Sequence, residues 1–202
     1  MIRQPLEIGV AQQASPGEVL SGDRYFLWQS DTRAVLGVID GLGHGAEAAL
    51  AAEAARAALD EPAGQSLREL ILRCHERLRG TRGATMTLIG IDTVSWLLEW
   101  IGVGNVVGVL LHPEGSGQLS RTELFVRGGV AGRSLPSTTA SIARIARGDM
   151  VVVATDGVRS GFAYDINRIE APQPLAERLL AQHHTGYDDA LIVAARIQRG
   201  ET

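Results

Sequence analysis

One arrangement, an apolar strand-forming run that passes directly into Asp-Gly, occurs twice in this sequence. The two runs are residues 34–39, which lead into Asp40, and residues 151–155, which lead into Asp156. Residues 34–39 contain no polar member, and such a strand is expected to be buried on both faces. The end of a strand holds the following carboxylate rigidly, and the glycine after it leaves space beside that carboxylate. We therefore expect both aspartates to lie at the rigid ends of buried strands.

Two further acidic positions precede strand-forming residues. Asp188 and Asp189 stand directly before the apolar run 190–193, and Asp23 stands before the run 25–29. Aspartates gathered at strand ends would repel one another strongly unless a cation neutralised them. Oxygen ligands of this kind suit hard cations such as Mg²⁺ and Mn²⁺. Two such ions, bridged by one carboxylate, can convert water to hydroxide near neutral pH and hold a phosphoryl oxygen.

A purely structural interpretation of these aspartates stays open at this point. Asp-Gly is a common turn dipeptide, and an aspartate between a strand and a helix often caps that helix. Taken singly, either Asp-Gly pair is more typical of a turn than of a catalytic site.

The order of the remaining patterns predicts the fold class. Strands are predicted at residues 6–10, 25–29, 34–39, 85–91, 96–101, 106–111, 119–126, 138–146, 150–154 and 190–197, and helices at residues 45–59, from Ser66 to a stop at Gly80, and at residues 174–181. Runs of adjacent strands, with the helices in separate stretches, favour an α+β fold with largely antiparallel sheets. Because no internal repeat or linker is evident, residues 1–202 are expected to form a single domain.

The helix that starts at Ser66 has clear local signals. Ser66 and Glu69 have the spacing of a capping box. Cys74 falls on the apolar face of this helix, so we expect it in the core rather than as a nucleophile. By contrast, His183 and His184 near the end of the last predicted helix are expected to be exposed, where the helix dipole favours them.

Composition narrows the classes of function. The formal net charge of −4 argues against a broad nucleic-acid interface, which requires a basic surface. The single cysteine cannot form an internal disulfide or a cysteine-based metal site, which fits a reducing compartment. No apolar run approaches the ~18 residues of a membrane span, and the N-terminal residues lack the pattern of a signal peptide. We therefore expect a cytoplasmic protein that binds neither nucleic acid nor membrane.

Six short motifs occur in order along the chain. They are Gly22-Asp23, Asp40-Gly41-Leu42-Gly43-His44-Gly45, Gly83-Ala84-Thr85, Gly102-Val103-Gly104-Asn105-Val106, Thr155-Asp156-Gly157 and Asp188-Asp189. Each motif alone is weak, but the ordered series resembles the bacterial branch of the metal-dependent type-2C serine/threonine protein phosphatases, which includes the sporulation stage II E phosphatase. The resemblance covers nearly the whole chain. The brevity of the chain, with no sensor domain attached, is similar to that of a stand-alone phosphatase of a stress pathway.

This resemblance implies a four-layer αββα sandwich of two mainly antiparallel sheets flanked by helices, with two metal ions, Mn²⁺ or Mg²⁺, in a cleft at one end. By position in the motifs, Asp40 would bridge the two ions and the Gly41 carbonyl would contact one of them. Asp156 and Asp188 would complete the shell of the other ion. Asp23 would support the metal-bound waters or a weaker third ion. A metal-bridging hydroxide would attack the phosphorus in line, without a phosphoenzyme.

Other positions near the motifs carry further expectations. Asp189, beside Asp188, is a further candidate metal ligand. Relatives usually have a threonine where this chain has Leu191, so we expect altered hydrogen bonding around the metal rather than loss of the metal. Arg24 and His44 are candidates for holding the substrate phosphate, chosen by proximity in the sequence, and a purely structural or surface role is the alternative for each.

The resemblance also implies a substrate. Phosphoserine or phosphothreonine on sulfate-transporter/anti-sigma-antagonist (STAS) domain proteins of the stressosome would be hydrolysed by a monomeric enzyme, which would reset a bacterial stress-response signal. Two alternatives are a catalytically inactive relative that binds a phosphorylated partner, and a metal-dependent hydrolase of small phosphate esters. A pure binder has no need of mutually repelling carboxylates, so catalysis is the leading prediction.

Overall fold

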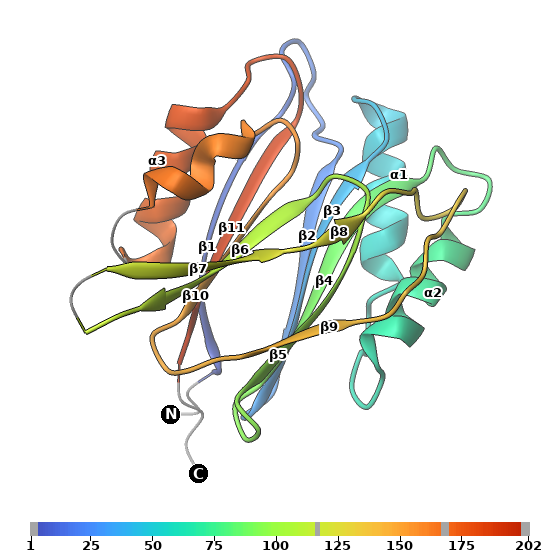
Figure 1. The fold of residues 1–202 in the computed structure, drawn as a ribbon. Coiled ribbons are helices and arrows are strands. Elements are labelled where there is room, and N and C mark those ends of the chain that lie inside the picture. The colour runs from blue at the N-terminus through green and yellow to red at the C-terminus, as the bar shows by residue number, and fades with distance from the viewer. Residues whose placement is uncertain (1–3, 116–117, 167–169, 199–202) are drawn as a thin grey trace.

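The computed structural model describes residues 4–115, 118–166 and 170–198, whose strands form two sheets (Figure 1). The first sheet has the order β1 (Leu6–Gln13), β11 (Ala190–Ile197), β10 (Met150–Ala154), β6 (Val107–Pro113) and β7 (Leu119–Leu124). The second has the order β2 (Asp23–Gln29), β3 (Arg33–Gly41), β4 (Ala84–Asp92), β5 (Leu97–Val103) and β8 (Val126–Arg127), and β9 (Ser141–Arg144) also pairs with β5. Among these described strands, the pairings are antiparallel except between β5 and β8.

Helices cover the outer faces of the two sheets. Helices α1 (Ala46–Ala57) and α2 (Leu67–Arg77) lie on the second sheet, and α3 (Pro172–His183) lies on the first, beside the 3-10 helix η1 (Ser160–Asp165) (Figure 1). The predicted α+β sandwich with an αββα order of layers is therefore confirmed. Of the helices that the structure describes, none has both the length and the apolar character needed to cross a membrane.

Strand β3 shows why a central strand of this fold is apolar throughout. Val35 and Ile39 belong to the core beneath α1 and α2, whereas Leu36 and Val38 belong to the core between the two sheets. Successive side chains of a strand point to opposite faces, so a strand covered on both faces needs apolar residues at every position. The predicted burial of residues 34–39 on both faces is confirmed.

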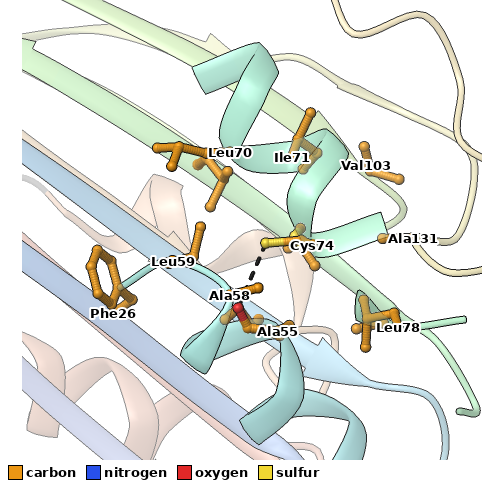
Figure 2. Packing of buried hydrophobic residues seen from close by; sticks show 14 of the residues in the cluster. Phe26, Ala55, Ala58, Leu59, Leu70, Ile71, Cys74, Leu78, Val103 and Ala131 are labelled. Carbon is orange, nitrogen blue, oxygen red and sulfur yellow. Dashed lines mark hydrogen bonds between the residues drawn. The ribbon is translucent and has the colours of Figure 1, made fainter. Parts of the chain in front are cut away.

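We call α1, α2 and the outer face of the second sheet the helical flank. It encloses a continuous apolar core in which Cys74 is fully buried, and the Cys74 thiol donates to the Ala55 carbonyl oxygen at 3.6 Å (Figure 2). At the start of α2, the Glu69 main-chain N–H donates to Ser66 Oγ, while the Glu69 carboxylate accepts from the Ser66 N–H at 2.8 Å. The core position of Cys74 and the capping box are both confirmed.

Several predicted strands differ from the structure at their ends, and two differ in how they pair or in how much of the predicted run is strand. The strand predicted at residues 119–126 breaks at Phe125, because β7 pairs within the first sheet whereas β8 pairs within the second. The strand predicted at residues 138–146 shortens to β9, most of whose residues are exposed at the sheet edge. The first error arises because the chain changes sheets at Phe125, which local alternation does not reveal.

The region around α3 also corrects a prediction. The helix predicted at residues 174–181 starts earlier, at Pro172, a residue suited to the first turn of a helix. His183 is buried rather than exposed, with Nε2 2.8 Å from Asp165 Oδ2. The exposure predicted for His183 was wrong because η1, a helix that was not predicted, covers that part of α3.

Candidate metal centre

Four predicted carboxylates gather at one end of the sandwich, and they come from both sheets. Asp40 is the penultimate residue of β3, and Asp23 lies opposite it on β2. Asp156 follows β10, and Asp188 precedes β11. Each of Asp156 and Asp188 is close enough to Asp40 for its charge to act on that carboxyl group. The strand ends thus bring Asp23, Asp40, Asp156 and Asp188 together.

The glycine of each Asp-Gly pair allows a second segment of main chain to pack against the strand end. A side chain on Gly41 would collide with the main chain of Ala48 in α1, and a side chain on Gly157 would collide with the main chain of Asp189. Only a residue without a Cβ fits such an approach. The repeated Asp-Gly is therefore a packing requirement as well as a turn signal.

A chain of polar side chains joins the carboxylate of one sheet to that of the other. Asn105, between β5 and β6, donates from Nδ2 to Asp156 Oδ2 at 2.6 Å. The Thr85 hydroxyl lies 2.7 Å from Asn105 Oδ1 and 3.3 Å from Asp40 Oδ2. Neither Asn105 nor Thr85 was predicted as a site residue, although both stand in the quoted motifs. In the sequence Asn105 is typical of a turn residue, and its partner Asp156 is 51 positions away, so local patterns do not connect the two.

Asp23 has its own partner from the opposite sheet. The Thr155 hydroxyl donates to Asp23 Oδ2 at 2.7 Å and accepts from the Leu191 main-chain N–H at 2.9 Å. The Leu191 side chain itself packs in the core between the sheets. At this position, therefore, the main chain of Leu191 rather than its side chain takes part in the polar network.

Burial and mutual repulsion disfavour the ionised forms of these carboxyls. Burial, followed by the charge of Asp40, raises the pKa of Asp23 to about 8 against the favourable hydrogen bond from Thr155. Burial, followed by the charges of Asp156 and Asp188, raises the pKa of Asp40 to about 7. Burial and Asp188 also raise the pKa of the more exposed Asp156. Such a cluster binds a cation readily, because the cation removes the repulsion.

Asp189 differs from its neighbour Asp188. It is buried, and its two carboxylate oxygens accept the main-chain N–H groups of Ser15 and Gly22, each at 2.8 Å. These bonds fasten the loop between β1 and β2 to the segment before β11. Asp188 instead accepts the Asp189 N–H on Oδ1 at 2.8 Å. In the structure both carboxylate oxygens of Asp189 therefore bind main-chain N–H groups. A role for Asp189 as a metal ligand stays a prediction.

The donor set fits a hard cation that keeps much of its own water. Among the residues that the structure describes, no group of three or more His, Cys, Asp or Glu side chains is arranged as a ready-made ion cage. The clustered donors of Asp40, Asp156 and Asp188 are nevertheless oxygens. Burial and repulsion raise the pKa values of Asp40 and Asp156. Mg²⁺ is usually held by one or two carboxylates and several waters, so this arrangement fits it.

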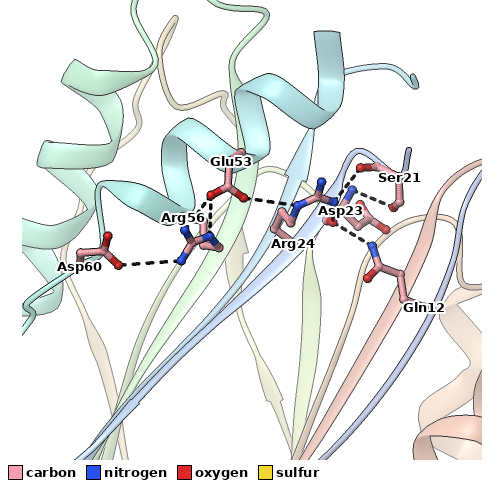
Figure 3. A network of polar contacts seen from close by, with 7 residues as sticks. All are labelled: Gln12, Ser21, Asp23, Arg24, Glu53, Arg56 and Asp60. Atoms are coloured by element: carbon pink, nitrogen blue, oxygen red, sulfur yellow. Dashed lines mark hydrogen bonds and ion pairs between the residues drawn. The ribbon is translucent and has the colours of Figure 1, made fainter. Parts of the chain in front are cut away.

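The two candidate phosphate-binding residues are engaged with other groups. Arg24 donates from Nη1 to the carbonyl oxygens of Ser21 (2.8 Å) and Asp23 (2.7 Å), and its Nε lies 3.5 Å from Glu53 Oε2 on α1 (Figure 3). Arg24 therefore braces the main chain that carries Asp23 against α1.

His44 is in a more open position. Its side chain is 63% exposed, and Nδ1 lies 3.0 Å from Glu18 Oε1 in the loop between β1 and β2. A phosphate-binding role for either Arg24 or His44 stays a prediction.

Comparison of the sequence with known proteins gives two matches. The model of the family described as stage II sporulation protein E (SpoIIE) matches residues 30–198. A protein named phosphoserine phosphatase RsbX, from Bacillus subtilis (strain 168), is 28% identical over 149 residues, which are 74% of this chain and 73% of that protein.

Solved structures share the whole fold. A structure described as "The bacterial stressosome: a modular system that has been adapted to control secondary messenger signaling" is 29% identical with a TM-score of 0.84, over 95% of this chain and 99% of the other. RsbX in complex with magnesium is 22% identical with a TM-score of 0.84, over 98% and 100% of the two chains. A chain that comprises the PP2C phosphatase domain and a fragment of the regulatory domain of SpoIIE from Bacillus subtilis is 19% identical with a TM-score of 0.77, over 100% of this chain and 66% of the other.

Proposed function

Because this chain belongs to the stage II sporulation protein E family, we propose that it is a metal-dependent phosphatase that hydrolyses phosphoserine and phosphothreonine in proteins. The observation that carries this proposal is the gathering of Asp23, Asp40, Asp156 and Asp188 at one end of the two sheets. Burial, followed by the charges of Asp156 and Asp188, raises the pKa of Asp40 to about 7, and a bound cation would relieve this repulsion.

Each carboxylate has a proposed role in holding two divalent ions, Mg²⁺ or Mn²⁺. Asp40, near the end of β3, would contribute to both ions, and the Gly41 carbonyl would contact one of them. Asp156 and Asp188 would hold the other ion, and Asp23 would support the waters around the ions or a weaker third ion. When bound, such ions lower the pKa of water and neutralise charge on a phosphoryl group. The hydrogen bonds of Asn105 and Thr85 hold the carboxylates of the two sheets in fixed orientations.

The substrate class is proposed from the relatives. RsbX is named as a phosphoserine phosphatase, and one structural relative is described in terms of the bacterial stressosome. We therefore propose phosphorylated STAS-domain proteins of a stressosome as substrates, acted on in the cytoplasm by a monomer whose residues 1–202 form one catalytic domain. Phosphate removal would reset the stress signal.

The direct test measures inorganic phosphate released from a phosphorylated STAS-domain protein. We expect release with Mn²⁺ or Mg²⁺ and none with a chelator. Asp40→Asn, which keeps the size of the side chain, should lower turnover by at least about 100-fold while the circular dichroism spectrum is unchanged. Metal-dependent hydrolysis of p-nitrophenyl phosphate without any action on phosphoproteins would instead favour a hydrolase of small esters. Failure of both substrates, with Mn²⁺ present, would indicate an inactive relative.

A further inference from the structure

Three large apolar side chains are exposed beside the carboxylate cluster. Val19 is 94% exposed and Leu20 is 50% exposed, both in the loop between β1 and β2. Tyr187, in the segment between α3 and β11, is 87% exposed. We call these three residues the rim surface. Single exposed apolar residues are ordinary on a protein surface, whereas a group of them at one place often marks a binding site.

Hydrogen bonds hold the two segments of the rim surface side by side. The Asp189 carboxylate accepts the main-chain N–H groups of Ser15 and Gly22, so both ends of the β1–β2 loop are fastened to the residue two positions after Tyr187. The Ser15 hydroxyl also donates to the Tyr187 carbonyl oxygen at 3.3 Å. The exposed side chains of the two segments therefore share one part of the molecular surface.

The same segments border the carboxylate cluster. The Gly41 N–H, next to Asp40, donates to the Gly22 carbonyl oxygen at 3.0 Å, and Gly22 directly precedes Asp23. Tyr187 directly precedes Asp188. The loop also contacts the segment after β3 through Glu18, whose carboxylate lies 3.0 Å from His44 Nδ1. The rim surface therefore adjoins the cluster on the side of Asp23 and Asp188.

We propose that Val19, Leu20 and Tyr187 form a docking surface for apolar side chains that surround the phosphorylated residue of a folded protein substrate. This inference rests on the proposed phosphatase function. The occupant follows from continuity with the cluster, because a folded domain that brings a phosphoserine to the cluster also brings its neighbouring surface toward the adjoining rim. A small phosphate ester enters the cluster without covering the rim. The rim surface therefore selects for protein substrates without changing the reaction.

The test compares two substrates and one matched control. Val19→Asp/Leu20→Asp should raise the KM for a phosphorylated STAS-domain protein at least about tenfold, whereas hydrolysis of p-nitrophenyl phosphate should be unchanged. Val94→Asp is the control, because Val94 is 72% exposed in the β4–β5 turn, at the end of these strands opposite to Asp40. It should change neither activity. Tyr187→Ala should weaken the phosphoprotein reaction, and Tyr187→Phe should restore it.

Equal effects of the rim and control variants on the phosphoprotein reaction would overturn the proposal. So would a wild-type dimer in light scattering that Val19→Asp/Leu20→Asp converts to a monomer, since the occupant would then be a second copy. If the wild type hydrolyses neither substrate, the proposed function fails, and the docking surface is tested by binding alone. Calorimetric titration with the phosphorylated protein should then show affinity that the rim variant loses and Val94→Asp keeps, and no difference between them would reject the docking surface as well.

Discussion

The helical flank and the carboxylate cluster each bury a titratable group, with opposite consequences. Burial raises the pKa of the Cys74 thiol to about 12, so the thiol stays neutral at pH 7 and donates to the Ala55 carbonyl oxygen. Burial also raises the pKa of Asp23, to about 8, but there the neighbouring charge of Asp40 adds to the effect. The flank thus buries the thiol in its neutral form, which burial favours. The cluster instead buries carboxyl groups whose pKa values lie near neutral pH.

This difference separates what stabilises the protein from what gives it a function. The flank follows the general rules for a core: apolar side chains, a capped helix and a satisfied thiol. The cluster departs from those rules, since it gathers like charges away from water. Proteins tolerate such departures mainly at functional sites. Changes in the two regions should therefore move activity and stability in different directions.

The largest expected effect comes from removing one charge of the cluster. Asp156→Asn should lower phosphate release at least about 100-fold, because a metal ligand is weakened. In the metal-free protein the same change should raise the unfolding temperature, since repulsion with Asp40 is relieved. Asp31→Asn, in the exposed turn between β2 and β3, is the control and should do neither. An Asp156→Asn protein that is less stable without metal would contradict the comparison.

A substitution in the flank should show the reverse pattern. Leu70 is fully buried in the flank core (Figure 2), and Leu70→Ala should lower the free energy of unfolding by about 2–5 kcal/mol. Urea unfolding measures this loss, and turnover per folded molecule should stay at the wild-type value. A large fall in turnover at a temperature where the variant is fully folded would show that the flank and the cluster are coupled.

The pH dependence of stability should reveal the cluster directly. With folded-state pKa values of about 8 for Asp23 and about 7 for Asp40, and an ordinary value of 3.8, the folded metal-free protein binds more protons than the unfolded chain between about pH 4 and pH 8. Its stability should therefore fall as the pH rises through this window. Unfolding temperatures of chelator-treated protein should be lower by about 10 °C or more at pH 8 than at pH 5.5. Saturating Mg²⁺ should remove the difference, and equal stability at the two pH values without metal would argue against the repulsion.

The smallest expected effect is at the start of α2. Ser66→Ala removes the hydroxyl that accepts the Glu69 N–H, so it should lower the free energy of unfolding by about 1 kcal/mol. Ser66→Asp supplies another capping acceptor and should restore most of the loss. Neither variant should change metal binding or turnover, and an effect of Ser66→Ala on the KM for Mg²⁺ would contradict the separation of the two regions.

Local patterns predicted the parts of the molecule that local physics determines. The apolar run ending at Asp40 identified β3 and its two covered faces, and the Ser66–Glu69 spacing identified the start of α2. Residues whose partners are distant in the sequence were not predictable in this way. Asn105 resembles an ordinary turn residue until Asp156 is placed beside it, and Phe125 resembles a strand residue until its flanking strands join different sheets.

The carboxylates themselves were predicted from their position at strand ends and from the family resemblance. The two kinds of evidence differed in which aspartates they could identify. Strand ends indicated Asp40 and Asp156, but they did not separate Asp188 from Asp189. The resemblance favoured Asp188 by its position in the motif. In the structure the two differ because the Ser15 and Gly22 N–H groups donate to the Asp189 oxygens, and these partners are 174 and 167 residues away in the sequence.

The Asp189 carboxylate also has a consequence for the entropy cost of the docking proposed for the rim surface. Because it already holds the loop that carries Val19 and Leu20, a protein arriving at the rim meets a surface that is ordered in advance. Little conformational entropy is then lost on binding, so affinity can be gained from few contacts.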